Sequence, residues 1–159
     1  MARSTALIAA VASALVTAIP AGASADEGRH LRLAVGIGAG KAFDASYFIA
    51  AARVGYAIAL GIEPSVEAQW WMGAAPSLGK LAPGLTWYLP LPMHPYLGAY
   101  YAHWFIESGG QNALGARGGV ELVSAGAASL TVGVAYERLL ACSASCDAWW
   151  PEATVGFRF

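Results

Sequence analysis

The stretch that decides the fold is WWPEATVGFRF, Trp149 to Phe159, in which two kinds of side chain alternate. If the stretch is an extended strand, alternate residues point to opposite faces. One face carries Phe159, Phe157, Val155, Ala153, Pro151 and Trp149. The other carries Arg158, Gly156, Thr154, Glu152 and Trp150. An apolar, aromatic-tipped face opposite a face with Arg and Glu is typical of a strand in a transmembrane β-barrel.

The first 25 residues have the features of a cleavable secretory signal peptide. Arg3 precedes an uncharged apolar run at residues 6–19, and residues 23–25, Ala-Ser-Ala, form a small-x-small cleavage site. An N-terminal membrane helix is the alternative, but the run is shorter than the roughly 20 residues that a spanning helix needs. We therefore predict a signal peptide at 1–25 and one domain at 26–159.

The composition argues against several classes of protein. The chain is 57% apolar and 12% charged, about half the charged share of a soluble domain. Of the nine Lys and Arg residues, Arg3 lies in the signal, which leaves eight basic side chains against ten acidic ones. Nucleic acid is therefore not an expected partner. The longest uncharged run of the domain, residues 81–106, contains four prolines and cannot form one regular membrane helix.

The two cysteines, Cys142 and Cys146, are separated by Ser-Ala-Ser. In a chain directed out of the reducing cytosol, this spacing predicts a small disulfide loop, with two free thiols as the alternative. A metal site is a weaker interpretation, because no His lies within ten residues of the pair and two thiolates do not fill a zinc shell. We expect no metal and no cofactor.

The two-residue alternation recurs along the domain and predicts eight strands. They run through residues 29–39, 48–58, 62–73, 81–89, 96–106, 114–122, 129–137 and 149–159. We expect loops at 74–80 and 107–112 and turns near Leu60 and at 90–95. The strand at 96–106 is aromatic on both faces. Its outward face is predicted to carry Leu97, Ala99, Tyr101, His103 and Phe105.

These strands predict an all-β fold, an eight-stranded antiparallel up-and-down transmembrane β-barrel. Strands of this length can cross the hydrocarbon layer when tilted. Closure leaves no edge, and only a closed sheet satisfies its backbone groups in lipid. A soluble eight-stranded barrel such as a lipocalin is the alternative, with its apolar face inward. It is disfavoured because the other face is poor in charge and rich in Gly and Ala.

The signal peptide, the eight alternating strands, the short turns and the terminal Phe resemble the small outer-membrane barrels of Gram-negative bacteria, the OmpA/OmpX/OmpW-like group. The resemblance implies location in the bacterial outer membrane, contact with its lipid, insertion by the barrel-assembly machinery and a monomeric state. It also implies an assembly signal formed by Phe159, Phe157, Val155 and Ala153. Pro151 departs from this pattern, because it lies on the same face and lacks a backbone donor.

If both ends of the domain are periplasmic, the inward charges fall into layers. A turn near Leu60 puts Arg53 opposite Glu67. The predicted lumen network consists of Arg32, Arg53, Glu63, Glu67, Arg117, Glu121, Glu152 and Arg158. An eight-stranded barrel has no open channel, and an unpaired buried charge costs several kcal/mol, so these groups should pair. Structural pairing is one interpretation of the network; a narrow, gated ion or water path is the other.

Outward aromatic residues are predicted to lie at the two membrane–water interfaces, as amphipathic rings do. They are Phe48, Trp70 and Trp149 at the outer interface, and Trp87, Phe157 and Phe159 at the inner one. The alternation along its strand places Arg138 on the lipid-facing side. It should lie at the outer rim, because a position at mid-bilayer costs about 2–4 kcal/mol.

Local candidates for catalysis are limited to His103, Glu107 and Ser108, and no motif of a lipid A-modifying enzyme surrounds them. His30 and His94 do not join them. We therefore predict no catalytic residues and no enzyme activity. The predicted function is a structural or passive role in the envelope. Passage of small hydrophobic compounds, as the OmpW-like resemblance implies, and a narrow ion path are the alternatives; surface adhesion and lipid A modification are weaker ones.

Overall fold

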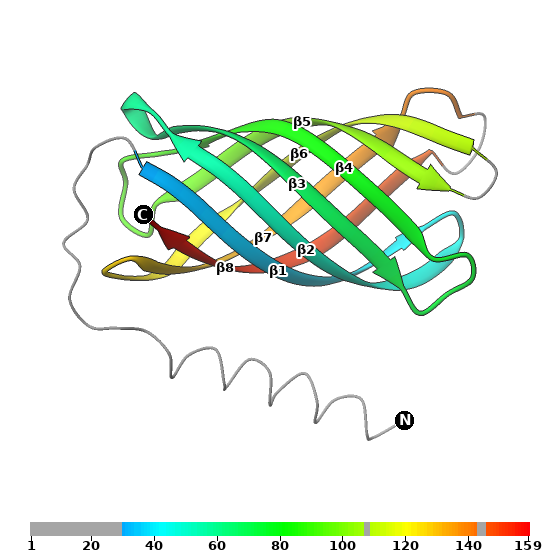
Figure 1. Ribbon diagram of the computed structural model, residues 1–159, viewed down its shortest axis with the longest axis horizontal. Coiled ribbons are helices and arrows are strands. Elements are labelled where there is room, and N and C mark those ends of the chain that lie inside the picture. Colours follow the sequence, from blue (N-terminus) through cyan, green and yellow to red (C-terminus); the bar gives the residue numbers. More distant parts are fainter. Residues whose placement is uncertain (1–29, 107–108, 143–145) are drawn as a thin grey trace, which may run out of the picture.

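The computed structural model describes residues 30–106, 109–142 and 146–159, and only the backbone of Ala59. These residues form a closed antiparallel barrel in which each strand pairs with its neighbours in sequence and β8 pairs with β1 (Figure 1). The strands are β1 (His30–Ala42), β2 (Ala45–Ala57), β3 (Ile62–Met72), β4 (Leu78–Tyr88), β5 (Pro95–Ile106), β6 (Gly109–Ala125), β7 (Ala128–Leu139) and β8 (Asp147–Arg158). The predicted eight-stranded barrel is confirmed. The predicted signal peptide lies outside the described residues.

The two ends of the barrel differ in their connections. The start of β1 and the end of β8 lie at one end, on the left in Figure 1, which we call the terminal end. The turn η1 (Ala59–Gly61) and residues 89–94 also lie there, and the opposite end is the distal end. Cys142 and Cys146 form a disulfide at the distal end, as predicted. Within the described ranges, no helix is long and apolar enough to cross a membrane.

Side chains alternate along each strand: the outward ones are mostly apolar, and the inward ones include the charged and many of the small residues. In β1, Leu33 and Val35 are 42% and 49% exposed, whereas Arg32 between Leu31 and Leu33 is 6% exposed. In β6 the alternation is interrupted by a bulge between Glu121 and Val123. The extra residue of a bulge lets two consecutive side chains point the same way. Accordingly, Leu122 and Val123 are both exposed.

The phase predicted for β5 is correct. Leu97, Tyr101 and Phe105 are exposed on the outer face. Tyr100 and Trp104 point inward and are buried. These inward rings belong to a buried apolar cluster whose larger members are Tyr47, Ile49, Trp71, Leu78, Tyr100, Trp104 and Trp150.

Two predicted loops are too long. The prediction of a loop at 74–80 is wrong for residues 78–80, because β4 begins at Leu78. The prediction of a loop at 107–112 is wrong for residues 109–112, which are the start of β6. Small and polar residues at these positions favour turns. In the barrel these segments are extended instead, because the neighbouring strand offers backbone groups that would otherwise be unpaired. For example, Trp71 of β3 pairs with Leu78, the first residue of β4.

Pro151 leaves a local gap in the ladder that closes the barrel. Pairing between β1 and β8 runs from Arg32 to Gly38 and resumes at Lys41, which lies opposite Trp149. The intervening part of β1 faces Pro151 and its neighbour. Since proline has no backbone N–H, it cannot donate to the ladder. Pro151 does lie opposite Val134 of β7, so the strand order is maintained.

Glycines of β6 and β7 make room for a large inward ring. A Cβ atom at Gly133 would meet Tyr96 Oη and the Gly118 carbonyl oxygen. A Cβ atom at Gly119 would meet the carbonyl oxygen of Val132 and, at 2.6 Å, the Cα atom of Gly133. A side chain at either position therefore requires the backbone to move.

We expect Gly119→Ala to lower the free energy of unfolding by about 1–3 kcal/mol, because the added methyl group overlaps backbone atoms. The measurement is urea unfolding of the protein in detergent micelles, followed by tryptophan fluorescence. Gly79→Ala is the matched control, since its Cβ atom would make only ordinary contacts at 3.7 Å with Phe105. Equal stability of the two variants would contradict the packing described for Gly119.

Candidate functional site: the charged lumen

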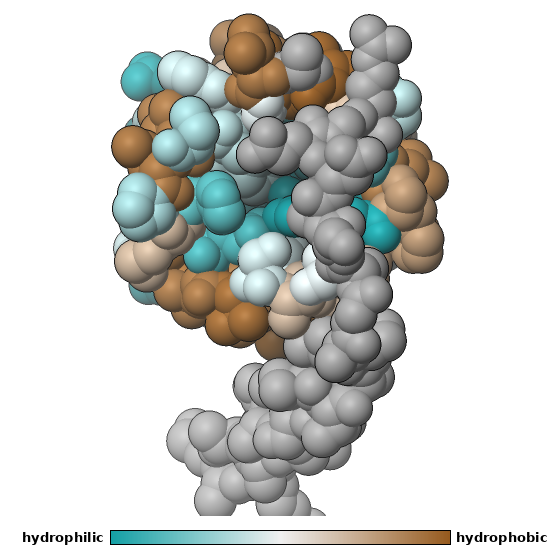
Figure 2. All heavy atoms as spheres, turned by 90° about the vertical axis from the view of Figure 1, so that its left-hand side faces the viewer, coloured by the Kyte–Doolittle hydropathy of each residue, from teal (hydrophilic) through white to brown (hydrophobic). Residues whose placement is uncertain are grey.

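The charged side chains inside the barrel form three groups along its axis. The terminal layer contains Arg32, Glu63, Glu121 and Arg158. The middle layer contains Arg53, Glu67, Arg117 and Glu152. The distal pair is Lys80 and Glu137. The face at the terminal end has a hydrophilic centre surrounded by hydrophobic residues (Figure 2). Among the described residues these groups are balanced, with five cations against five carboxylates.

The middle layer is centred on the carboxylate of Glu67, which is 2% exposed. Arg53, directly opposite on β2, donates from Nε to Glu67 Oε2 at 2.6 Å. Arg117, from β6, donates from Nη1 to Oε2 at 2.8 Å and from Nη2 to Oε1 at 3.0 Å. Bidentate Arg–carboxylate pairs are among the strong charge-assisted hydrogen bonds. One carboxylate therefore links strands β2, β3 and β6 through the lumen.

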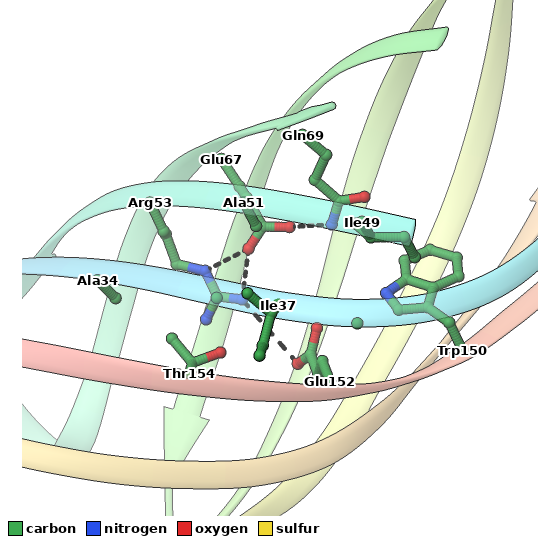
Figure 3. A pocket seen from close by; sticks show the side chains of 12 residues that line it. Ala34, Ile37, Ile49, Ala51, Arg53, Glu67, Gln69, Trp150, Glu152 and Thr154 are labelled. Atoms are coloured by element: carbon green, nitrogen blue, oxygen red, sulfur yellow. Dashed lines mark hydrogen bonds and ion pairs between the residues drawn. The ribbon is translucent and has the colours of Figure 1, made fainter. Parts of the chain in front are cut away.

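Glu152 of β8 completes the middle layer (Figure 3). Its carboxylate lies 4.0 Å from Arg53 Nη2 and 3.7 Å from Arg117 Nη1, and Tyr96 Oη donates to it at 3.2 Å. The cavity beside this layer has a volume of about 10 Å³. A cavity of that size holds about one water molecule. Side chains therefore fill the lumen at this level.

The terminal layer is organised around Glu121. Arg158 Nη2 donates to both carboxylate oxygens of Glu121 at 2.9 Å, and Arg32 Nη2 donates to Oε2 at 3.3 Å. Arg32 also lies 3.6 Å from the Glu63 carboxylate, and its guanidinium carbon is 4.6 Å from the centre of the Tyr88 ring. Each carboxylate of this layer therefore has a guanidinium partner.

The distal pair was not predicted as part of the lumen network. Lys80 Nζ donates to Glu137 Oε1 at 3.0 Å, and the two side chains are 0% and 1% exposed. The sequence places Glu137 inward, but the loop predicted at 74–80 removes its partner from the strand. One signal in the sequence could have revealed the pair. The four Arg and four Glu of the predicted network balance in charge, so the inward Glu137 needs a further cation.

Four aromatic rings surround the ammonium group of Lys80. We call them the aromatic plug: Trp71, Tyr100, Trp104 and Trp150. Their ring centres lie 5.8, 5.4, 5.1 and 4.3 Å from Lys80 Nζ, respectively. Trp71 contacts Trp104 and Trp150 edge to face, with ring centres 4.9 and 5.0 Å apart. Such rings attract a desolvated cation through their faces, so the plug both fills the distal lumen and stabilises its charge.

The remaining predicted residues lie on the outer surface, and one of them, Trp87, also borders the opening at the terminal end. The predicted interface aromatics Phe48, Trp70, Trp87 and Trp149 are 40%, 53%, 47% and 64% exposed. The predicted assembly residues Ala153, Val155 and Phe157 face outward on β8, and Phe159 beyond it is 72% exposed. Arg138 is exposed opposite Asp147 near the distal end of β7. Their roles in lipid contact and assembly stay predictions.

The local candidates for catalysis do not form a described constellation. His103 faces outward on β5, and its Nδ1 atom is 2.7 Å from Asn112 Oδ1. Glu107 and Ser108 lie outside the described residues. In the part of the chain that the structure describes, no group of three or more His, Cys, Asp or Glu side chains could hold a metal ion.

We expect Glu67→Ala to reduce the free energy of unfolding by about 3–5 kcal/mol, because it removes the negative charge that two buried guanidinium groups share. Asp147→Asn also removes one carboxylate, but from an exposed position, and should change stability by no more than about 0.5 kcal/mol. Urea unfolding in the same micelles measures both. A loss for Glu67→Ala no larger than that of the control would disprove the central position of Glu67.

We expect Lys80→Met alone to destabilise the barrel by about 3–5 kcal/mol, because it leaves the Glu137 carboxylate buried without its cation. The double variant Lys80→Met, Glu137→Gln removes both charges and should recover most of that loss, as apolar or neutral replacements of buried pairs often do. A double-mutant cycle on unfolding free energies measures the coupling. Additive losses in the double variant would show that the two side chains do not interact.

Comparisons with known proteins place the fold. No protein-family model and no curated protein sequence matches the chain. The crystal structure of Neisserial surface protein A (NspA) is similar at 19% identity, with a TM-score of 0.63, covering 87% of this chain and 99% of that one. The N-terminal β-barrel domain of OprF from Pseudomonas aeruginosa is similar at 13% identity, with a TM-score of 0.63, covering 80% of this chain and 97% of that one. At these identities the similarity concerns the fold alone, and the chain has the fold of the small eight-stranded outer-membrane barrels.

Proposed function

We propose that the protein is an integral outer-membrane barrel with a structural, passive role in the bacterial envelope. The observation that carries this proposal is the middle layer, in which Arg53, Glu67, Arg117 and Glu152 fill the lumen from four different strands. A lumen occupied in this way has no path for solutes larger than water. The barrel then contributes an inert, rigid wall to the membrane rather than a pore.

The distribution of charge on the outer wall supports a position in lipid. Among the described residues, the exposed Lys, Arg, Asp and Glu side chains are Lys41, Asp44, Arg138 and Asp147. All four belong to the distal end of strands β1, β7 and β8 or to the turn between β1 and β2. A charge on the lipid-facing side is costly at mid-bilayer and nearly free at the interface. The uncharged wall between the two ends therefore suits the hydrocarbon layer.

The proposed partners follow from the same surface. Apolar side chains are exposed on the outer face of every strand, which suits outer-membrane lipid. A sheet that closes within one chain presents no strand edge to a second copy, which supports a monomer. Insertion by the barrel-assembly machinery, with Phe159 and the outward residues before it as the signal, belongs to the same proposal.

Passage of small hydrophobic compounds through the wall is the second candidate. It is favoured by a groove of about 410 Å³ on the outer face of β1, β2 and β3. Small side chains, Ala52 and Ala68, form part of its lining, and inward residues Ala34 and Arg53 contribute as well. The outer face of the wall is therefore recessed at this place.

We expect the wild-type protein in planar lipid bilayers to produce no conductance steps above those of a protein-free bilayer, because paired side chains fill the lumen. Glu67→Ala serves as the comparison, since it loosens the middle layer. Reproducible steps in the wild type that change with Glu67→Ala would replace the passive role with an ion path. Protein-dependent uptake of small hydrophobic compounds into liposomes, without conductance, would favour the second candidate.

A further inference from the structure

A cavity of about 610 Å³ opens at the terminal end of the barrel. It lies above the terminal layer, between the turn η1 and residues 89–94. Pockets for small molecules usually measure about 300–1,000 Å³ and combine apolar walls with a few polar groups. We call this cavity the terminal vestibule, and its lining includes Arg32, Leu60, Trp87, Tyr88, His94 and Arg158.

The lip of the terminal vestibule holds apolar side chains in the open. Leu60, which lines the cavity, is 85% exposed, and Met93, next to the lining residue His94, is 57% exposed. Both residues have positive φ angles, 63° and 64°, a conformation uncommon for residues other than glycine. Trp87 Nε1 donates to the Leu60 carbonyl oxygen at 3.1 Å and so joins the turn η1 to β4. Strained backbone of this kind clusters at sites that clamp ligands.

The charged and polar side chains beneath the lip differ in how far solvent can reach them. The side chains of Glu63 and Glu121 are buried, at 2% and 1% exposed. Among the accessible polar side chains that line the vestibule are those of Arg158, which is 22% exposed, and His94, which is 57% exposed. His94 Nδ1 lies 3.7 Å from Glu121 Oε1, next to the same carboxylate that Arg158 contacts. A ligand entering the vestibule therefore meets Arg158 and His94 before the two carboxylates.

We propose that the terminal vestibule binds a small amphipathic anion, such as a medium-chain carboxylate. The acidic head group contacts Arg158 and His94, and the apolar chain lies against Leu60 and Trp87. A wholly polar anion leaves the apolar lip uncovered, and an amphipathic cation meets like charge at Arg158. Binding here goes beyond the passive envelope role and does not require a path through the lumen.

The test is to titrate the protein with octanoate. The protein is expressed as the full chain and reconstituted in phosphatidylcholine nanodiscs, and empty nanodiscs are the blank. The signal is the NMR shift of the Trp87 indole N–H. We expect a saturable shift, weakened about tenfold or more in Arg158→Gln, because a hydrogen bond to a charged group contributes about 1.5–3 kcal/mol. Arg158→Lys keeps the charge and should retain most of the affinity. Octyltrimethylammonium, with the same chain and the opposite charge, should bind at least tenfold more weakly.

Two further variants separate binding from folding and from net charge. Leu60→Gly suits the left-handed backbone at this position and should weaken octanoate binding severalfold by removing apolar contact. Lys41→Gln removes one positive charge at the distal end and should leave binding unchanged. The proposal is overturned if octanoate causes no saturable shift, if octyltrimethylammonium binds as tightly, or if Lys41→Gln weakens binding as much as Arg158→Gln.

Discussion

The carboxylate of Glu67, shared by Arg53 and Arg117, is the interaction on which the interior of this barrel depends. Closing eight strands satisfies the backbone and turns every second side chain toward a narrow lumen. Charges placed there have little water to solvate them, so each needs an opposite charge nearby. Glu67 meets this requirement for two guanidinium groups at once, and Glu152 lies within 4.0 Å of both.

The narrow lumen also decides which residues lie beside one another. Two inward tyrosine rings lie where a neighbouring strand has glycine and therefore no side chain. A Cβ atom at Gly115 would overlap the ring of Tyr100, and one at Gly133 would overlap the hydroxyl group of Tyr96. The glycines are therefore part of the packing and not a weakness of the strands, since they accommodate rings that occupy the volume of the lumen.

The two ends of the barrel are chemically unlike. Toward the distal end, the aromatic plug surrounds the buried ion pair of Lys80 and Glu137. Toward the terminal end, the lumen widens into the terminal vestibule, where Arg158 and His94 are accessible. A closed half and an open half in one small barrel allow a ligand to bind at one end while the lumen stays filled.

The sequence by itself determined the number of strands, the face that the residues of the predicted strands occupy, and the disulfide. These properties depend on a two-residue period and on short spacings, which are local. The opposition of Arg53 and Glu67 depends on one turn between adjacent strands, and it is local for the same reason. Only the tertiary structure decided that Lys80 belongs to β4 and meets Glu137 of β7, 57 residues away. Closure and strand tilt bring such residues together across the lumen, and neither is encoded in the period of any single strand.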